Sequence, residues 1–365
     1  MKYTFLMLIY CLFGFSCSVA KERSNYGSVL LGKDLQAYGR YRVDSLQNLH
    51  LISSAVHFGF RFEGKNCKIF ASLPDVNSHN YIQYELDGKY VKRIKIEGRQ
   101  KEPIILSAPT PGKHTIIIYK ATEAHTGDVV IEKIEGKKIS ALDITPAPLI
   151  EFIGNSITCG AAADASDVAC GTGSYHDQHN AYQAYGPRVA RELNTHFILS
   201  SVSGIGIYRN WNSDGPAMPQ VYEKTDFRSD GATLWNFNQY TPRVVSIALG
   251  TNDFSNGDGK RARLPFDSAA FVTAYIKFVN LVVTKYPTTQ IALLSSAMVN
   301  GPNRVLLQNC LEAVKSVVDA QKGTKPIALY FFKPMQARGC SGHPSVEDHK
   351  ILASELVPFF KSLLL

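Results

Sequence analysis

The sequence lacks the cysteine spacing of a structural metal site. Five cysteines lie beyond residue 20, and no two of them form a C-x-x-C pair or another zinc-like pattern: Cys67, Cys159, Cys170, Cys310 and Cys340. The sequence is also poor in charge, since only 19% of its 365 residues are Asp, Glu, Lys or Arg, while 45% are hydrophobic. This composition is typical of a folded globular protein with enough length for two modest cores. We expect no metal and no cofactor.

The N-terminal segment is not apolar for long enough to cross a membrane as a helix. Residues 1–20, MKYTFLMLIYCLFGFSCSVA, carry one charge at Lys2 and then a short apolar run, which is typical of a bacterial export signal. Ser18-Val19-Ala20 suits cleavage after small residues, whereas Gly14-Phe15-Ser16-Cys17 loosely resembles a lipoprotein processing site. We therefore expect an exported protein that is periplasmic, secreted or anchored at the cell surface by a lipid on Cys17.

No nucleic-acid-binding motif accompanies the net charge of +8. The densest basic run lies between Lys89 and Lys101, where apolar residues are interleaved with four basic ones: Lys92, Arg93, Lys95 and Arg99. This interleaving predicts the solvent-exposed face of an antiparallel strand. We expect no nucleic-acid partner.

From about Gly27 to Ile144 no long helical periodicity is present. Short runs rich in β-branched and aromatic residues, such as AVHFGFRFEG, YIQYELDGK and DVVIEKIEG, are separated by turn signals. Asp87-Gly88 and Glu97-Gly98 are typical of hairpin turns. The pattern predicts that residues 21–145 form an all-β jelly-roll sandwich.

The pattern changes after the short proline-bearing segment 143–148, where we place a domain boundary. Apolar strands then alternate with helical segments, for instance PLIEFIG followed by AYQAYGPRVARELN and HFILSSVSG. This alternation predicts an α/β domain in residues 146–365, with a parallel sheet between two layers of helices. Such sheets bind ligands at the carboxyl ends of their strands.

Four short segments at the predicted strand ends carry groups suited to acyl transfer. Ser156 follows the first apolar strand and can act as a nucleophile, with His343 as its general base. The N–H groups of Ser156 and Gly204 and the side-chain amide of Asn252 can together form an oxyanion hole. Each residue alone has an ordinary explanation in a turn, in packing or at the surface. Their common placement at one sheet edge favours catalysis.

These blocks resemble those of SGNH, or GDSL-type, hydrolases: Gly154-Asn155-Ser156-Ile157, Ser203-Gly204, Gly250-Thr251-Asn252-Asp253 and His343-Pro344. More narrowly, a jelly-roll domain before such a domain resembles carbohydrate esterase family 2. The similarity extends to NAYQAYGPRVAREL, SGIGIYRNW and WNFNQYTPRVVSIALGTND. The resemblance implies a serine esterase that removes O-acetyl groups from plant cell-wall polysaccharides such as acetylated xylan and glucomannan.

Two features depart from the usual hydrolase blocks. Asn155 stands where those blocks have aspartate, and an amide can make similar supporting hydrogen bonds. Ser341 and Cys340 occupy the positions, two and three residues before the histidine, where an orienting acid commonly stands. Two acidic residues follow on the next predicted helix and are expected to face away: Glu347 and Asp348. We therefore predict a Ser156–His343 dyad in which a backbone carbonyl holds the imidazole.

Cys159 and Cys340 each stand three residues from a predicted catalytic residue. A working site brings both into one neighbourhood, so we predict a Cys159–Cys340 disulfide, with Cys159–Cys170 as the alternative. Tyr208 and Trp211 lie just beyond Gly204, where a sugar ring could stack, and are weaker candidates for substrate contact.

His176 and His179, with Asp177 between them, superficially have the spacing of metal ligands. They lie in a polar loop rich in Gly and Ser, and we expect them to border the substrate cleft instead. We expect a monomer whose partner is an acetylated polysaccharide or oligosaccharide. Two alternatives are an inactive esterase that binds carbohydrate, and an SGNH lipase or thioesterase, which would need an apolar acyl pocket.

Overall fold

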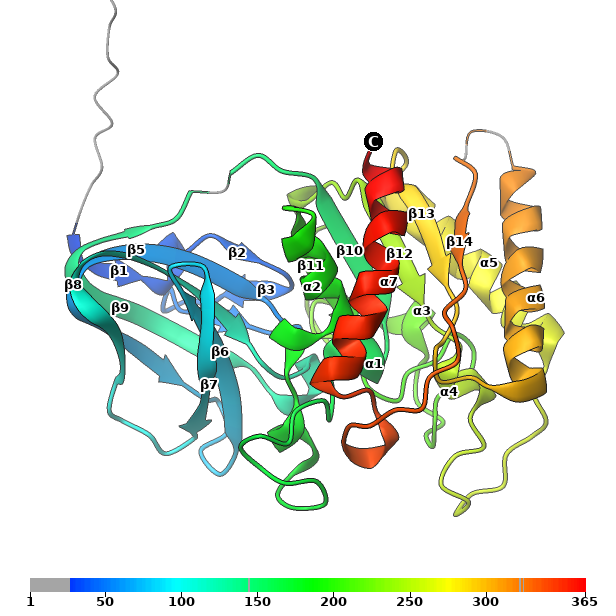
Figure 1. The fold of residues 1–365 in the computed structure, drawn as a ribbon, viewed down its shortest axis with the longest axis horizontal. Coiled ribbons are helices and arrows are strands. Elements are labelled where there is room, and N and C mark those ends of the chain that lie inside the picture. The colour runs from blue at the N-terminus through cyan, green and yellow to red at the C-terminus, as the bar shows by residue number, and fades with distance from the viewer. Residues whose placement is uncertain (1–26, 144, 322, 324) are drawn as a thin grey trace, which may run out of the picture.

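The computed structural model describes residues 27–365 apart from 144, 322 and 324 (Figure 1). The expected export signal, with Cys17, lies outside the described residues. Within the described part of the chain, no helix is both long enough and apolar enough to cross a membrane.

The first part of the chain is all antiparallel β. Its strands are β1 (Gly27–Leu31), β2 (Ala37–Tyr38), β3 (Tyr41–Val43), β4 (Leu49–Leu51), β5 (His57–Ser72), β6 (His79–Leu86), β7 (Lys89–Glu97), β8 (Ile104–Lys120) and β9 (Val129–Ala141). The sheet runs in the order β3-β4-β9-β5-β8-β6-β7, with β1 on β9 and β2 on β5. The register of β5 with β8 shifts between Gly64 and Asn66, which lets these long strands bend around a shared core. The predicted all-β domain is confirmed.

The second part of the chain has a five-stranded parallel sheet in the order β11-β10-β12-β13-β14. Its strands are β10 (Leu149–Gly154), β11 (His196–Ser201), β12 (Val244–Ala248), β13 (Gln290–Leu294) and β14 (Ala328–Tyr330). The α-helices are α1 (Ser156–Cys159), α2 (Tyr185–Glu192), α3 (Met218–Val221), α4 (Thr251–Phe254), α5 (Ser268–Lys285), α6 (Gly301–Asp319) and α7 (Val346–Leu364). Short 3₁₀ helices are η1 (Gly32–Asp34), η2 (Ala124–Thr126), η3 (Tyr175–Gln178), η4 (Ala181–Gln183), η5 (Phe237–Gln239) and η6 (Cys340–Gly342).

Helices cover both faces of the parallel sheet, as Figure 1 shows. Residues of α3, α5 and α6 share one hydrophobic core with the sheet, and residues of α2 and α7 share the other. The central strands are buried on both faces, so they are mainly apolar and do not alternate; all six residues of β10 are buried, including Glu151. The predicted three-layer α/β domain is confirmed, while the boundary at residues 145 and 146 stays a prediction.

One arginine of the first domain is buried inside the second. Arg40 has no exposed surface, and its guanidinium donates hydrogen bonds to the carbonyls of Tyr222 (2.6 Å) and Lys224 (2.5 Å). The same group lies 4.1 Å from the ring centroid of Phe227, which gives a cation–π contact. Arg40 therefore links the two domains through a guanidinium that is shielded from solvent.

The basic run of β7 is only partly exposed. Arg93, which we expected on a solvent-exposed face, is 7% exposed. It donates to the backbone carbonyls of Asp177 (2.8 Å) and His179 (2.6 Å) in the second domain. The expectation was wrong for this residue because alternation along a strand assigns a face, and this face is covered by another domain.

We predict that Arg40→Ala lowers the free energy of unfolding by about 3 kcal/mol, because two buried carbonyls lose their donor and a cavity forms among aromatic rings. Urea unfolding would measure the change. The matched control is Arg42→Ala, two residues along the chain, where a 43% exposed side chain pairs with Asp128 and should contribute at most about 1 kcal/mol. Equal losses in the two variants would contradict the assignment.

Candidate active site

Ser156 is the first residue of α1, directly after the buried strand β10. Asn155 caps this short helix, because its Oδ1 accepts the N–H of Ile157 at 3.1 Å. The supporting hydrogen bond that we expected from Asn155 in place of an aspartate is therefore present. Ser156 is 7% exposed, and its Oγ faces a cavity at the carboxyl edge of the sheet.

The imidazole of His343 lies between two oxygen atoms. Its Nε2 is 2.9 Å from Oγ of Ser156, and its Nδ1 is 3.0 Å from the carbonyl oxygen of Ser341. A carbonyl oxygen can only accept, so Nδ1 carries the proton and Nε2 is free to accept the proton of the Ser156 hydroxyl. Burial lowers the pKa of His343, which favours the neutral, basic form.

The loop before His343 is fixed by its own backbone. Ser341 has a φ of 51°, in the left-handed region, which turns its carbonyl back toward the imidazole. The N–H of His343 donates to the carbonyl of Cys340 at 3.0 Å, and the N–H of Gly339 donates to the carbonyl of His343 at 2.7 Å. A side chain at Gly339 would meet three backbone oxygens at 2.7 to 2.9 Å, so glycine is required there.

The acidic residues after His343 face away from it. Ser345 and Asp348 form the expected capping box of α7, and Asp348 also accepts hydrogen bonds from Nε (2.6 Å) and the backbone N–H (2.8 Å) of Arg338. Glu347 is exposed. Among the described residues, Nδ1 of His343 has the Ser341 carbonyl as its partner and contacts no carboxylate.

Two further loops bring Gly204 and Asn252 to the cavity that Ser156 lines. Gly204, just after β11, has a φ of +75°, a conformation that other residues rarely adopt. The side chain of Asn252 donates one N–H to the carbonyl of Ile205 at 2.7 Å, which leaves its second N–H available to a ligand. Both residues line the same cavity as Ser156 and His343.

Asp253, next to Asn252, is a supporting residue that we did not single out from the sequence. Its buried carboxylate accepts the backbone N–H groups of Ile207, Tyr208 and Arg209 at 3.0 to 3.2 Å. Burial raises the pKa of Asp253 to about 6, and these donors oppose that rise. The side chain anchors the loop after Gly204 to α4. The position of Asp253 directly after Asn252 was the one feature of the sequence that could have pointed to this role.

The cavity has a volume of about 780 Å³ and is lined by the predicted catalytic and oxyanion residues. Trp211 lines it and is 44% exposed. Tyr208 does not line it, because its ring packs against Phe266 and Phe271 and its hydroxyl accepts the N–H of Asp267. Our expectation that Tyr208 lies where it could contact a sugar in the cavity is therefore wrong.

Tyr175 lines the cavity, and sequence reasoning missed it. Its hydroxyl is 3.3 Å from Nε2 of His343, the ring nitrogen that also contacts Ser156. Its ring packs edge-on against His179 at 4.8 Å between centroids. His179 itself is fully buried, so it lies beneath the cavity and does not border it as expected.

The disulfide joins Cys170 to Cys340, so both pairings that we considered for Cys159 are wrong. The thiol of Cys159 points inward, 3.2 Å from Oγ of Ser201, and burial raises its pKa well above the usual value. The carbonyl of Ala162 accepts the N–H of Cys340, and the loop that begins there folds back to bring Cys170 alongside. Spacing from Ser156 did not reveal which way the Cys159 side chain points.

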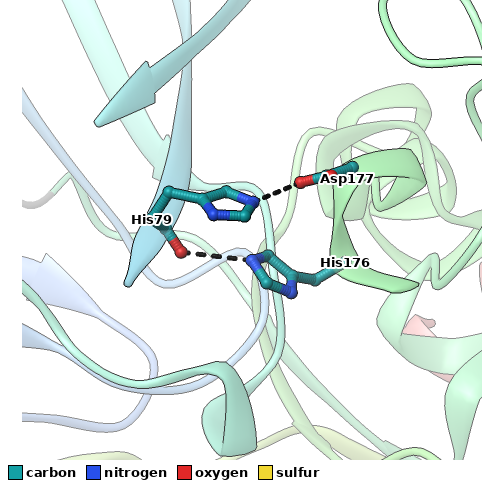
Figure 2. A group of neighbouring side chains, drawn as sticks. All are labelled: His79, His176 and Asp177. Atoms are coloured by element: carbon teal, nitrogen blue, oxygen red, sulfur yellow. Dashed lines mark hydrogen bonds and ion pairs between the residues drawn. The ribbon is translucent and has the colours of Figure 1, made fainter. Parts of the chain in front are cut away.

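His176 and Asp177 contact His79 of strand β6, as Figure 2 shows. Nε2 of His79 donates to Oδ1 of Asp177 at 2.5 Å, and Nε2 of His176 donates to the carbonyl of His79 at 3.1 Å. The two rings are stacked with centroids 4.5 Å apart, and the Nε2 atom of each ring is hydrogen-bonded to an oxygen of the protein. The group is a contact between the domains.

A parallel α/β sheet with a serine, a histidine and two predicted oxyanion residues, Gly204 and Asn252, at one cavity is typical of the class of SGNH (GDSL-type) hydrolases. Residues 152–331 match the GDSL-like lipase/acylhydrolase family, and residues 37–146 match the family described as carbohydrate esterase 2 N-terminal. The chain belongs to carbohydrate esterase family 2.

Similar proteins agree with this assignment. An acetylxylan esterase / glucomannan deacetylase from Cellvibrio japonicus (strain Ueda107) is 24% identical over 303 residues, which cover 81% of this chain and 80% of the relative. The cellulase/esterase CelE of Acetivibrio thermocellus is 30% identical over 297 residues, which cover 78% of this chain but 34% of that longer relative. 

Solved structures share the two-domain fold. A family two carbohydrate esterase from Cellvibrio japonicus has a TM-score of 0.80 at 23% identity, covering 92% of this chain and 97% of that one. A family two carbohydrate esterase from Clostridium thermocellum in complex with cellohexaose has a TM-score of 0.77 at 25% identity, covering 92% and 99%.

We predict that Cys170→Ser lowers the free energy of unfolding by roughly 2 to 5 kcal/mol under oxidising conditions, because the disulfide closes a long loop in the unfolded chain. Chemical unfolding with and without dithiothreitol would measure this: the reductant should destabilise the wild type and leave the variant unchanged. Peptide mapping without reduction should recover a Cys170–Cys340 peptide, and a linked Cys159 would contradict the assignment.

Proposed function

We propose that this chain is a serine esterase that removes O-acetyl groups from plant cell-wall polysaccharides such as acetylated xylan and glucomannan. The observation that carries the proposal is the 2.9 Å contact between Oγ of Ser156 and Nε2 of a His343 whose tautomer is fixed by a carbonyl. The names of its relatives support the choice of acetylated carbohydrate as substrate.

The chemistry follows from the positions of these groups. Nε2 of His343 takes the proton of Ser156 as Oγ attacks the acetyl carbonyl carbon. The oxygen that becomes negative is stabilised by the backbone N–H groups of Ser156 and Gly204 and by the free side-chain N–H of Asn252. The imidazolium then protonates the sugar oxygen, the C–O bond breaks and an acetyl-enzyme forms. Water, activated by the same imidazole, releases acetate.

A dyad suffices here because the Ser341 carbonyl does what an orienting acid does for geometry. It fixes which nitrogen carries the proton and holds the ring toward Ser156. It offers only a dipole to the imidazolium, where a carboxylate would offer a full charge. Stabilisation of that charge must come from elsewhere in the site.

We propose that the substrate is a polysaccharide or oligosaccharide bound with its acetyl group in the cavity and a sugar ring on Trp211. The half-exposed indole at the cavity wall offers a flat apolar face of the kind that stacks on sugars. We further propose that the enzyme is exported, periplasmic, secreted or lipid-anchored at Cys17, and that it works as a monomer. The paired Ser156 and His343 favour an enzyme over a purely carbohydrate-binding protein.

We predict that Ser156→Ala lowers the release of acetate from acetylated xylan or glucomannan by at least about 10⁴-fold, because the acyl-enzyme cannot form. Acetate release measured enzymatically would test this against wild type. Glu347→Gln is the matched control and should leave turnover unchanged, because this carboxylate is exposed and does not contact His343. Loss of turnover in the folded Glu347→Gln variant would contradict the dyad.

We predict that Trp211→Ala raises KM for acetylated oligosaccharides about tenfold, because a stacked ring contributes roughly 1 kcal/mol or more. The same variant should hydrolyse 4-nitrophenyl acetate with an unchanged KM, since that ester needs no sugar contact. Steady-state kinetics with both substrates would separate the two effects, and equal changes in KM would argue against stacking.

A further inference from the structure

A carboxylate of the all-β domain lies directly beneath the active site. Glu123 follows strand β8 and is 4% exposed. Its Oε2 accepts the backbone N–H of Ser203 at 2.6 Å, and its Oε1 is 3.4 Å from Nε2 of His179. Oε2 also lies 3.6 Å from the Cys159 thiol. All three partners belong to the α/β domain, so the side chain crosses the boundary between the domains.

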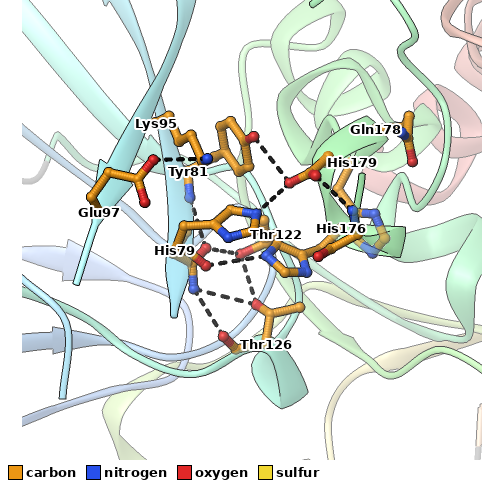
Figure 3. A network of polar contacts seen from close by, with 12 residues as sticks. His79, Tyr81, Lys95, Glu97, Thr122, Thr126, His176, Gln178 and His179 are labelled. Atoms are coloured by element: carbon orange, nitrogen blue, oxygen red, sulfur yellow. Dashed lines mark hydrogen bonds and ion pairs between the residues drawn. The ribbon is translucent and has the colours of Figure 1, made fainter. Parts of the chain in front are cut away.

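The turn that carries Glu123 is held from within its own domain. Oγ1 of Thr122 donates to Oδ1 of Asn80 on β6, and Nδ2 of Asn80 donates to the carbonyl of Thr126 at 3.1 Å. Figure 3 shows Thr122 and Thr126 in this network. The buried ammonium of Lys120 donates to the carbonyl of Glu123 at 2.6 Å. Residues on both sides of Glu123 are thus anchored, and the carboxylate has little freedom to move.

Glu123 reaches the oxyanion loop in one step. Ser203, whose N–H it accepts, immediately precedes Gly204. Because Gly204 is in the left-handed region and has no side chain to pack, the direction of its own N–H depends on how the neighbouring peptide is held. The hydrogen bond to Glu123 supplies that constraint.

Glu123 reaches the histidine by a second route. It contacts His179, whose ring packs edge-on against Tyr175, and the Tyr175 hydroxyl is 3.3 Å from Nε2 of His343. The other ring nitrogen of His179 accepts the N–H of Ala162 at 3.3 Å, beside the loop that holds Cys340. Through His179, this carboxylate therefore supports both Tyr175 and the Ala162 backbone that binds Cys340.

The carboxylate is ionised. Burial alone would raise its pKa, but the hydrogen bonds from His179 and Ser203 outweigh burial and hold the pKa of Glu123 at about 2. Its negative charge also raises the pKa of His343, against the lowering caused by burial of that histidine. Glu123 is thus a fixed negative charge near an imidazole that contacts no carboxylate among the described residues.

We propose that Glu123 is a positioning residue of the active site, which holds the Val202–Ser203 peptide next to the one that carries the Gly204 N–H and supplies from the all-β domain the negative charge that a dyad otherwise lacks. This inference rests on the proposed esterase function. It makes the all-β domain part of the active site, because the hydrolase domain alone would lack this carboxylate.

Other ionisable groups act on the same two residues. The ionisable groups that face Glu123 or His343 from the surrounding elements are His179, Tyr175, Cys159, Lys120 and His349, and the Ser156 hydroxyl contacts His343. His179, His349 and Glu123 are the groups whose charges interact with that of His343. The two histidines belong to the second domain and Glu123 belongs to the first. A change at Glu123 can therefore be tested without altering the hydrolase domain.

The test uses the full chain and the substrate 4-nitrophenyl acetate. Glu123→Gln keeps an oxygen for the N–H of Ser203 but removes the charge, so we expect kcat to fall about tenfold with KM little changed, because the imidazolium formed during catalysis loses a nearby negative charge. Catalysis needs neutral His343, so kcat/KM falls as pH drops through its pKa. Loss of the negative charge lowers that pKa, and the acidic limb should move to lower pH by roughly half a unit.

Glu85→Gln is the matched control. Glu85 is also a buried glutamate of the all-β domain, 6% exposed, and its carboxylate accepts the hydroxyl of Tyr182 in the second domain at 2.5 Å. Its hydrogen-bond partners among the described residues, Tyr119 and Tyr182, do not line the cavity. We expect its substitution to change thermal stability and leave both kcat and the acidic limb as in the wild type.

Glu123→Asp covers the case in which Glu123→Gln does not fold. It keeps the charge but shortens the side chain, so kcat should fall through the weakened bond to Ser203 while the acidic limb stays in place. An unchanged kcat in either folded Glu123 variant would overturn the proposal. So would an equal loss of kcat in Glu123→Gln and Glu85→Gln with no shift of the acidic limb in either. An inactive wild type would instead refute the proposed function, since the comparison starts from its activity.

Discussion

The proposed active site depends on one hydrogen bond between a histidine and a backbone carbonyl. Nδ1 of His343 binds the carbonyl of Ser341, which selects the tautomer and turns Nε2 toward Ser156. The left-handed conformation of Ser341 and the absence of a side chain at Gly339 let the chain make so tight a loop. A site that orients its base in this way needs a rigid backbone, and the disulfide at Cys340 ties that backbone to the opposite loop.

The two domains form one unit because charged groups of the first are buried in the second. Arg40 lies among aromatic rings, Arg93 binds the carbonyls of Asp177 and His179, and Glu123 accepts the N–H of Ser203. A buried charge is costly unless its hydrogen bonds are satisfied, so each of these side chains requires the partner domain in one orientation. Domain packing and active-site geometry are therefore coupled.

Much of the fold could be predicted because it depends on local pattern. The β-branched runs and turns before residue 143 predicted antiparallel strands, and the change to alternating strands and helices predicted the parallel sheet. Parallel strands place their carboxyl ends at one edge, which is why Ser156, Gly204 and Asn252 could be brought together from sequence alone. The missing acid before His343 likewise predicted the carbonyl contact.

The sequence by itself determined the two fold classes, the residues at the sheet edge and the lack of an acid beside the histidine, since each follows from periodicity and chain order. Only the tertiary structure decided which cysteine pairs with Cys340, that Tyr208 packs inward while Tyr175 faces the cavity, and that Glu123 lies beneath the site. These depend on side-chain direction and on contacts between distant segments. Spacing along the chain carries no information about either.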